Sequence, residues 1–226
     1  MLAVGFLDDL KRQADAARAA QTIDTAALER NTALADAACK TVFSYFNTLG
    51  QQLQVLKPVS KVRYTLDKRT VFDALPMLAF RTDARRKHLR GAEVFDHVVM
   101  QCQLRTEQRI HLVKDFLPDI EKLESRLRQS GVRFDAEAVR NPENNKLLEM
   151  RYTLPVDFTL AVRAVPDHDA GWIRFQLNNL DGFETVNVDF PATEVGSARL
   201  DELARWLVGE PHRFLDDGHN LRRVEA

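Results

Sequence analysis

Apolar residues recur at helical spacing through the first quarter of the chain. The pattern that begins at Phe6 and Leu7 predicts a first helix over about residues 5–20. Asp24 or Thr25 then offers an N-cap for a second, longer helix, which Pro58 ends. We expect either an antiparallel helical hairpin or a long helical arm that pairs with a second copy of the protein.

The second predicted helix carries apolar side chains seven residues apart, with a companion row four residues further on. This spacing is typical of a seam against another helix. The predicted contact row consists of Leu28, Ala35, Val42, Phe46, Leu49, Leu53 and Leu56. If the helix packs only on its own body, these side chains are core. If it projects, another chain must bury them, because an exposed apolar stripe of that length marks an interface.

Beyond Ser60 the apolar period changes from helical spacing to two, as in Val62, Tyr64 and Leu66. Alternation of this kind predicts strands with one buried and one solvated face. Further strands are predicted at residues 77–81, 93–105, 108–114, 132–138, 147–154, 156–165, 172–178 and 183–190. Pro155 predicts a bend or an edge position between two of them. Helical spacing returns near 118–130 and 197–208, and the residues after Leu215 form a frayed or docked tail.

These elements predict an α+β protein, because strands cluster together instead of alternating strictly with helices. A helical hairpin or arm over residues 1–58 would precede a mainly antiparallel sheet of about six to eight strands over residues 59–226. We expect the two parts to form one compact unit.

Composition is that of an ordinary globular protein, with 226 residues of which 45% are hydrophobic and 29% charged. No apolar run approaches the roughly 20 residues of a membrane span, and the acidic start is not a secretory signal. Cys39 and Cys102 fall at positions that predict small buried hydrophobes. We therefore expect no membrane association and a cytoplasmic location.

Charge is unevenly distributed along the chain, although its net value is only −1. Residues 59–114 carry a net +6 and residues 115–226 a net −7. The two parts either neutralise each other on folding or steer an anionic partner to the middle segment.

The densest run of cations lies at residues 81–90, which we expect to form the loop of a β-hairpin. Its members are Arg81, Arg85, Arg86, Lys87 and Arg90. Arginine forks suit phosphate oxygens, so this loop predicts an alternative function in binding nucleic acid or another polyanion. The loop has no aromatic side chains of the kind that single-strand binders use for stacking.

Sequence motifs for chemistry are missing. The chain has no G-x-G-x-x-G, P-loop, Cys-x-x-Cys, His-Glu-x-x-His or G-x-S-x-G pattern. Two clusters pair imidazole with carboxylate: Asp167, His168 and Asp169, and then His212, Asp216, Asp217 and His219. Such groups can bind divalent metals, but a turn and a polar tail explain them equally well. We therefore predict no metal and no cofactor.

The function that these patterns favour is a non-enzymatic binding or assembly protein. Its N-terminal helices would mediate self-association or hold a protein partner, and the sheet could receive a ligand or peptide. Polyanion binding is the first alternative. The second is an enzyme whose residues converge only in three dimensions, which a deep pocket lined by His97, His111 or His168 would indicate.

Overall fold

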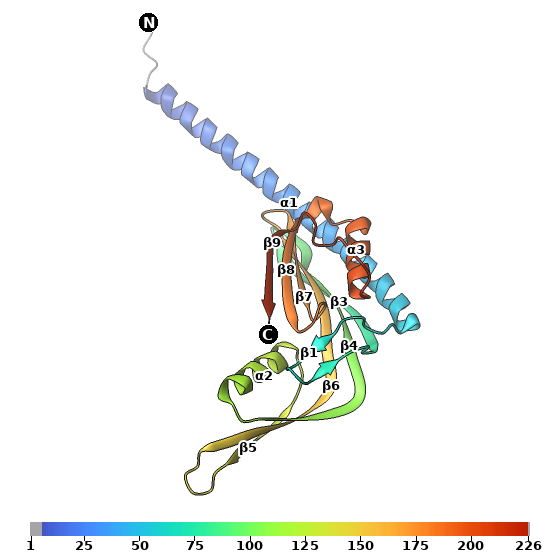
Figure 1. Ribbon diagram of the computed structural model, residues 1–226. Coiled ribbons are helices and arrows are strands. Elements are labelled where there is room, and N and C mark those ends of the chain that lie inside the picture. Colours follow the sequence, from blue (N-terminus) through green and yellow to red (C-terminus); the bar gives the residue numbers. More distant parts are fainter. Residues whose placement is uncertain (1–5, 226) are drawn as a thin grey trace.

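The computed structural model describes residues 6–225, and the side chains of 7–15 and 24–224 (Figure 1). The helices are α1 (Phe6–Leu56), α2 (Leu117–Gln129) and α3 (Ser197–Leu207), with a short 3-10 turn at Ala192–Glu194. The strands are β1 (Tyr64–Thr65), β2 (Val71–Phe72), β3 (Met77–Leu89), β4 (Ala92–Lys114), β5 (Asp135–Arg140), β6 (Leu147–Asp167), β7 (Trp172–Asn178), β8 (Glu184–Pro191) and β9 (His219–Glu225). The predicted α+β class, with its mainly antiparallel sheet, is confirmed.

Helix α1 is a single element of 51 residues, so the chain has the predicted arm and not the hairpin. At 1.5 Å per residue it is about 75 Å long. The break expected before Asp24 or Thr25 does not occur. Residues that favour a helix cap do not by themselves end a helix, and this stretch contains neither glycine nor proline to do so.

The main sheet is seven-stranded among the described residues and antiparallel throughout, with the order β3-β4-β6-β7-β8-β9 and β5 beside the first half of β6. Each of its two longest strands joins two segments that the sequence predicts as separate. In β4 they meet at a register shift between Arg105 and Arg109, and in β6 they meet at Pro155. These two strands run the whole length of the sheet, as Figure 1 shows.

Pro155 lies within β6, where its missing N–H costs no ladder bond. Its register partner on one side is Arg109, next to the β4 irregularity. On the other side β5 pairs with β6 only up to Thr153, and β7 pairs with it only from Ala161. The proline therefore occupies a locally open edge, as the sequence predicts.

The basic segment 81–90 is not a loop, contrary to expectation. Residues 81–89 belong to β3, and the chain turns at Arg90 and Gly91, which both have positive φ. Two residues of this kind between Leu89 and Ala92 form the tight hairpin connection that matches the twist of the flanking strands. Long cationic side chains are compatible with a strand as long as every second one faces solvent.

The sheet has one apolar and one polar face. On β6, alternate residues from Tyr152 to Pro166 are buried, while those between them are partly exposed. Helices α1 and α3 cover the upper part of the apolar face, where Phe43 of α1 meets Phe95 and Trp206 of α3 meets Phe214. Cys39 and Cys102 lie in this core as predicted, and burial raises the pKa of each thiol to about 12.

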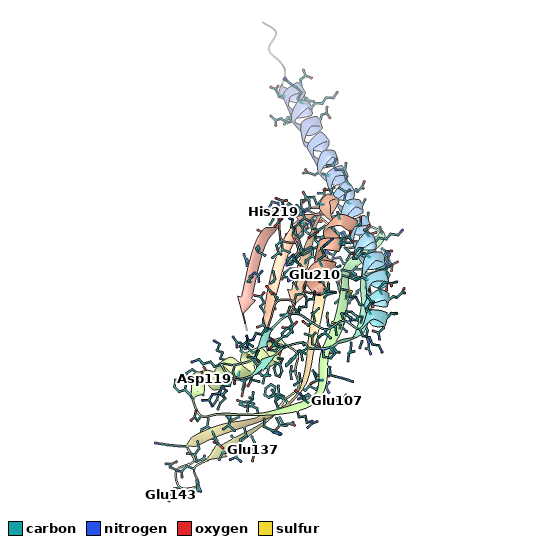
Figure 2. The ribbon with its side chains drawn as sticks, turned by 45° about the vertical axis from the view of Figure 1, so that its right-hand side comes forward. Glu107, Asp119, Glu137, Glu143, Glu210 and His219 are labelled. Atoms are coloured by element: carbon teal, nitrogen blue, oxygen red, sulfur yellow. The ribbon has the colours of Figure 1, made fainter. Side chains whose placement is uncertain are left out.

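Helix α2 and the two-stranded sheet of β1 and β2 pack at the other end of the molecule. Tyr152 donates a hydrogen bond to Glu124 of α2, and Arg126 donates to the carbonyl oxygen of Leu66. Lys114 at the end of β4 forms a 2.6 Å ion pair with Asp67. The β5–β6 hairpin projects beyond this end, with Glu143 at its tip (Figure 2).

The chain segment after Leu215 ends as an ordered edge strand. Strand β9 pairs with β8, and Arg223 forms ion pairs with Asp181 and Glu184. No helix among the described residues is both long and apolar enough to cross a membrane.

Candidate functional site

The predicted contact row divides into buried and unburied members. Four of its seven side chains lie in the chain's own core: Ala35, Val42, Phe46 and Leu53. Leu49 packs against that core, Leu28 is half-buried, and Leu56 is 71% exposed. In the second half of α1, most of the predicted contact row is therefore buried by the protein's own body and not by another chain.

The first half of α1 extends away from the sheet, as Figures 1 and 2 both show. Its described side chains before Leu28 are exposed except for Ala27, and they include Leu7 at 80% and Leu10 at 47%. Leu10 and Leu28 are 18 residues apart, close to five helical turns, so they lie on the same side of the helix. The projecting part is named here the arm (residues 6–28). On the side that Leu10 and Leu28 share, its sequence places Ala14 and Ala17 and then the polar Gln21 and Asp24.

A hydrogen-bonded joint fixes the point at which the arm leaves the body. Asn31 donates to the carbonyl oxygen of Asp169 at 2.7 Å, and the Thr32 hydroxyl accepts a 2.6 Å hydrogen bond from Arg90. Arg90 also forms an ion pair with the Asp169 carboxylate. One turn further along, Asp36 accepts from the backbone N–H of Phe95 at 2.8 Å. The helix is held by both hairpin turns, β3–β4 and β6–β7.

The five cations of the basic segment do not converge. Arg85 is the register partner of His97, on the polar face, and Lys87 reaches that face to pair with Asp96 at 3.4 Å. Arg81 lies four residues before Arg85 in the alternation and shares its face. Arg86 instead stacks over the Phe95 ring at 4.3 Å, on the side of α1. Arg90 belongs to the joint, so three of the five remain available on one surface.

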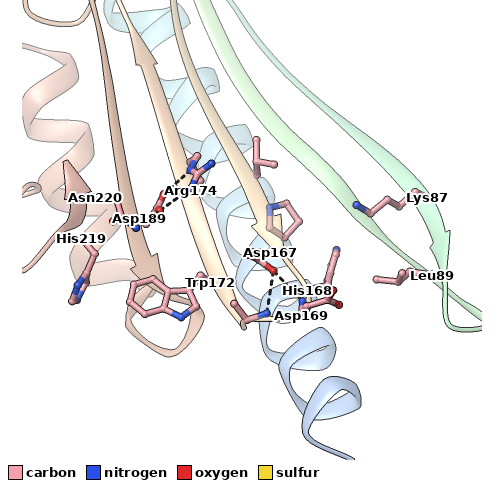
Figure 3. Close-up of a pocket in the computed structure, with 13 residues that line it drawn as sticks. Lys87, Leu89, Asp167, His168, Asp169, Trp172, Arg174, Asp189, His219 and Asn220 are labelled. Atoms are coloured by element: carbon pink, nitrogen blue, oxygen red, sulfur yellow. Dashed lines mark hydrogen bonds and ion pairs between the residues drawn. The ribbon is translucent and has the colours of Figure 1, made fainter. Parts of the chain in front are cut away.

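A pocket of about 630 Å³ opens at the end of the polar face where β6 turns into β7. Its walls come from β3, β6, the β6–β7 turn, β7, β8 and β9. The lining residues are Lys87, Leu89, Val165, Pro166, Asp167, His168, Asp169, Ala170, Trp172, Arg174, Asp189, His219 and Asn220. Figure 3 shows Lys87 and Leu89 on one side, Arg174 and Trp172 on the other, and Asp167 between them. Strand register explains the assembly, since Val165, Arg174, Asp189 and His219 are successive partners across β6 to β9.

The strongest polar contact in the pocket is the bidentate pair of Arg174 and Asp189. Nε lies 2.8 Å from one carboxylate oxygen and Nη2 lies 2.9 Å from the other. Asn220 donates to the same carboxylate at 2.9 Å. The Arg174 guanidinium lowers the pKa of Asp189 despite its burial, and Asn220 adds to the effect. Asp189 is 6% exposed and is therefore a structural anchor that fixes the guanidinium in place.

Aromatic rings and a structured turn complete the pocket. The Trp172 and His219 rings meet nearly at right angles, with centroids 4.9 Å apart. Asp167 accepts hydrogen bonds from the backbone N–H groups of Asp169 and Ala170, at 3.1 and 3.0 Å, through Oδ1. This pattern is an Asx-type turn, so one carboxylate oxygen shapes the loop, and no hydrogen bond within the described residues uses the other.

The histidine and carboxylate clusters of the sequence are dispersed. His168 is buried, its Nε2 lies 2.8 Å from the carbonyl oxygen of Phe95, and its Nδ1 has no hydrogen-bond partner within the described part of the chain. His212 stacks on Trp206 of α3, whereas His219 contacts Trp172 of β7. Among the side chains that the structure describes, no three His, Cys, Asp or Glu residues form a group that could hold a metal ion.

The other two histidines singled out by sequence lie on the polar face of the sheet outside the pocket. Nδ1 of His97 lies 2.9 Å from Asp96 and 3.1 Å from Arg163. His111 contacts the Thr153 hydroxyl at 2.9 Å. Of the three histidines proposed for an enzyme pocket, only His168 lines the cavity. No nucleophilic serine, threonine or cysteine accompanies it there.

Sequence reasoning missed Trp172, Arg174 and Asp189 as pocket residues, because their convergence depends on strand order. One signal was present. In β7 and β8 an arginine and an aspartate alternate with apolar residues, so both fall on the face of the sheet opposite to Ile173, Phe175, Val188 and Phe190.

Comparisons of the chain with protein-family models, with curated proteins and with solved structures found no match. Functional inference therefore rests on the surfaces described above.

Proposed function

We propose that the protein is an assembly protein whose arm pairs with the arm of a second copy. The observation that carries this proposal is the continuity of α1. The body covers the apolar side of α1 beyond Leu28, and the arm leaves Leu7 and Leu10 exposed near its start.

The local sequence of an uncovered helix of this kind contributes little to its stability. Isolated helices of about 12–15 residues are marginal in water, and longer ones normally depend on packing of an apolar face. The arm has an alanine-rich sequence with leucines near its start. Small side chains allow a second helix to approach closely along the stripe, which supports a helical partner over a bulky globular one.

Charge on the arm supports a second copy as that partner. The arm carries four acidic and three basic side chains: Asp8, Asp9, Asp15, Asp24, Lys11, Arg12 and Arg18. Two such helices of nearly balanced charge repel each other only weakly in antiparallel contact, and a twofold axis would make the contact closed and self-complementary. The joint at Asn31, Thr32 and Arg90 would hold each arm in a fixed direction for this contact.

Light scattering at low and high salt tests the proposal. The expected result is a dimer mass that persists at high salt, because apolar burial is insensitive to screening. The double substitution Leu7→Glu with Leu10→Glu should yield the monomer mass. The matched control is Val55→Glu with Val113→Glu, which places the same charges at exposed apolar positions outside the arm. A monomer in the unmodified protein, or a dimer that the arm variant leaves intact, would refute the proposal.

Polyanion binding stays an alternative prediction. Arg81, Arg85 and Lys87 on one face support it, but Asp83 and Asp96 lie beside them and reduce the positive potential. A nucleic-acid gel shift at low salt with no retarded species would remove it. The absence of enzyme activity and a cytoplasmic location also stay predictions.

A further inference from the structure

We propose that the pocket at the β6–β7 turn binds a neutral polyhydroxyl ligand, namely a sugar. This inference is independent of assembly through the arm, because the pocket lies on the polar face of the sheet and the apolar side of α1 does not contribute to it.

The pocket has the size and composition of a small-ligand site. Its volume of about 630 Å³ falls within the usual range of roughly 300–1,000 Å³ for such sites. Val165, Pro166 and Leu89 give it apolar walls, and polar groups from β3, β6 and β7 converge between them (Figure 3).

Most charges around the pocket are compensated in pairs, and the remaining carboxylate, Asp167, interacts electrostatically with Arg174. Arg174 is matched by Asp189, Asp169 by Arg90, and Lys87 by Asp96. Anions would face Asp167 at the centre of the pocket, and cations would face the guanidinium of Arg174 and the ammonium of Lys87. This balance disfavours ligands with a net charge of either sign and favours a neutral one.

Hydrogen-bonding groups of both kinds remain for a ligand. Arg174 uses Nε and Nη2 for Asp189, and no described residue accepts from Nη1. Asp167 uses Oδ1 for the turn, which leaves Oδ2 as an acceptor. Sugar hydroxyls both donate and accept, so adjacent hydroxyls of one ring can satisfy an arginine and a carboxylate at the same time.

Trp172 supplies the apolar part of the recognition. Its indole lies next to Asp167, since the two residues are register partners, and contact with His219 fixes its position. Pyranose rings present C–H groups on one face and hydroxyls around the rim. Packing the C–H face on the indole buries apolar surface and directs hydroxyls toward Asp167 and Arg174.

NMR of the two indole N–H groups tests this site in the full chain. Trp172 lines the pocket, whereas Trp206 is buried in the core, and the spectrum of Trp172→Phe assigns the two signals. Glucose, galactose, mannose and N-acetylglucosamine are each titrated to about 100 mM, which detects binding as weak as millimolar to tens of millimolar. At least one sugar should shift the Trp172 signal saturably and leave the Trp206 signal in place.

Asp167→Asn is the decisive variant, because its remaining carbonyl oxygen can keep the turn while Oδ2 is replaced by a donor. It should weaken sugar binding about tenfold, in line with loss of a charged hydrogen bond. Asp115→Asn, the same change at an exposed position of the other end of the molecule, should bind as the unmodified protein does. Inorganic phosphate and choline chloride serve as charged probes.

The proposal is overturned if none of the four sugars shifts the Trp172 signal. It is equally overturned if phosphate or choline saturates the signal instead, or if Asp167→Asn binds sugar undiminished. Light scattering of the same samples shows whether the arm pairs, so failure of the pocket and failure of assembly are distinguishable.

Discussion

The two halves of α1 form one continuous helix and have opposite surroundings. Residues 29–56 lie on the sheet, with Phe46 and Val42 completely buried. Residues 6–28 continue the helix beyond the joint, and there Leu7 and Leu10 face solvent. Periodicity therefore identifies the side of a helix that requires an apolar partner, but it does not say whether that partner is the same chain.

Phe46→Ala should give the largest effect, because it tests the covered half. Removing a fully buried phenylalanine ring leaves a cavity, and we expect unfolding free energy to fall by about 3–5 kcal/mol. Chemical denaturation followed by circular dichroism measures the loss. A change below about 1 kcal/mol would mean that this half is not anchored in the core, since ordinary surface substitutions stay in that range.

Arg90→Ala tests the boundary between the halves. The variant leaves the Thr32 hydroxyl and the Asp169 carboxylate without their common partner, so a loss of roughly 1–3 kcal/mol is expected. Hydrogen exchange should increase at residues 28–34 and stay unchanged near Phe46. Uniform exchange along α1 would show that Arg90 does not define where the arm begins. Arg81→Ala, at an exposed site of β3, is the control.

Asp67→Asn tests an ion pair remote from both halves. Burial raises the pKa of Asp67, but Lys114 and the backbone N–H groups of Arg69 and Thr70 outweigh it and lower the pKa to about 2. A lowered folded-state pKa stabilises the protein above the unfolded value near 4, and this contribution disappears as pH falls toward 2. The variant should lose about 1–2 kcal/mol at pH 7 and match the unmodified protein near pH 2.

Stability curves measured from pH 2 to pH 7 check the preceding expectation. Parallel curves for the two proteins across that range would show that the Asp67 carboxylate does not contribute through its charge.

Leu10→Ala in the arm should give the smallest effect. At concentrations where the protein is monomeric, loss of a half-exposed side chain outside the core should change unfolding free energy by less than about 0.5 kcal/mol. The comparison with Phe46→Ala then separates intramolecular from intermolecular burial. If Leu10→Ala destabilises the monomer as much as Phe46→Ala does, the arm contacts its own body in solution.

Much of the fold follows from local sequence, and the exceptions have physical causes. The change of period near Ser60 correctly separates helix from sheet, and Pro118 and Ser197 mark the starts of α2 and α3 within a residue or so. The sequence patterns predicted a break in α1 at Asp24 and a break in β6 at Pro155. Both elements are continuous, because a cap residue can lie inside a helix and a proline inside a strand that is locally unpaired on one side. A cap residue or a proline shows only that a helix or strand can end at that position. Packing and strand pairing around the residue determine whether the element ends there.

The site was less accessible to sequence than the fold. Pairing of Arg174 with Asp189 requires β7 and β8 to be neighbours in a particular register, and Lys87 reaches the same pocket from β3. Single-sequence periodicity gives the face on which each side chain lies. It does not give the distance between two strands that are far apart along the chain.

The register of the two longest strands, β4 and β6, also favours one order in which their residues pair during folding. Their register partners are nested: Lys114 with Met150 closes the shortest loop, and Val98 with Ala164 the longest. Each pair that forms shortens the loop that the next pair must close. Pairing of β4 with β6 can therefore propagate from the α2 end of the sheet toward the pocket. Folding-rate analysis should then find that the Leu112–Tyr152 pairing forms before the Val98–Ala164 pairing.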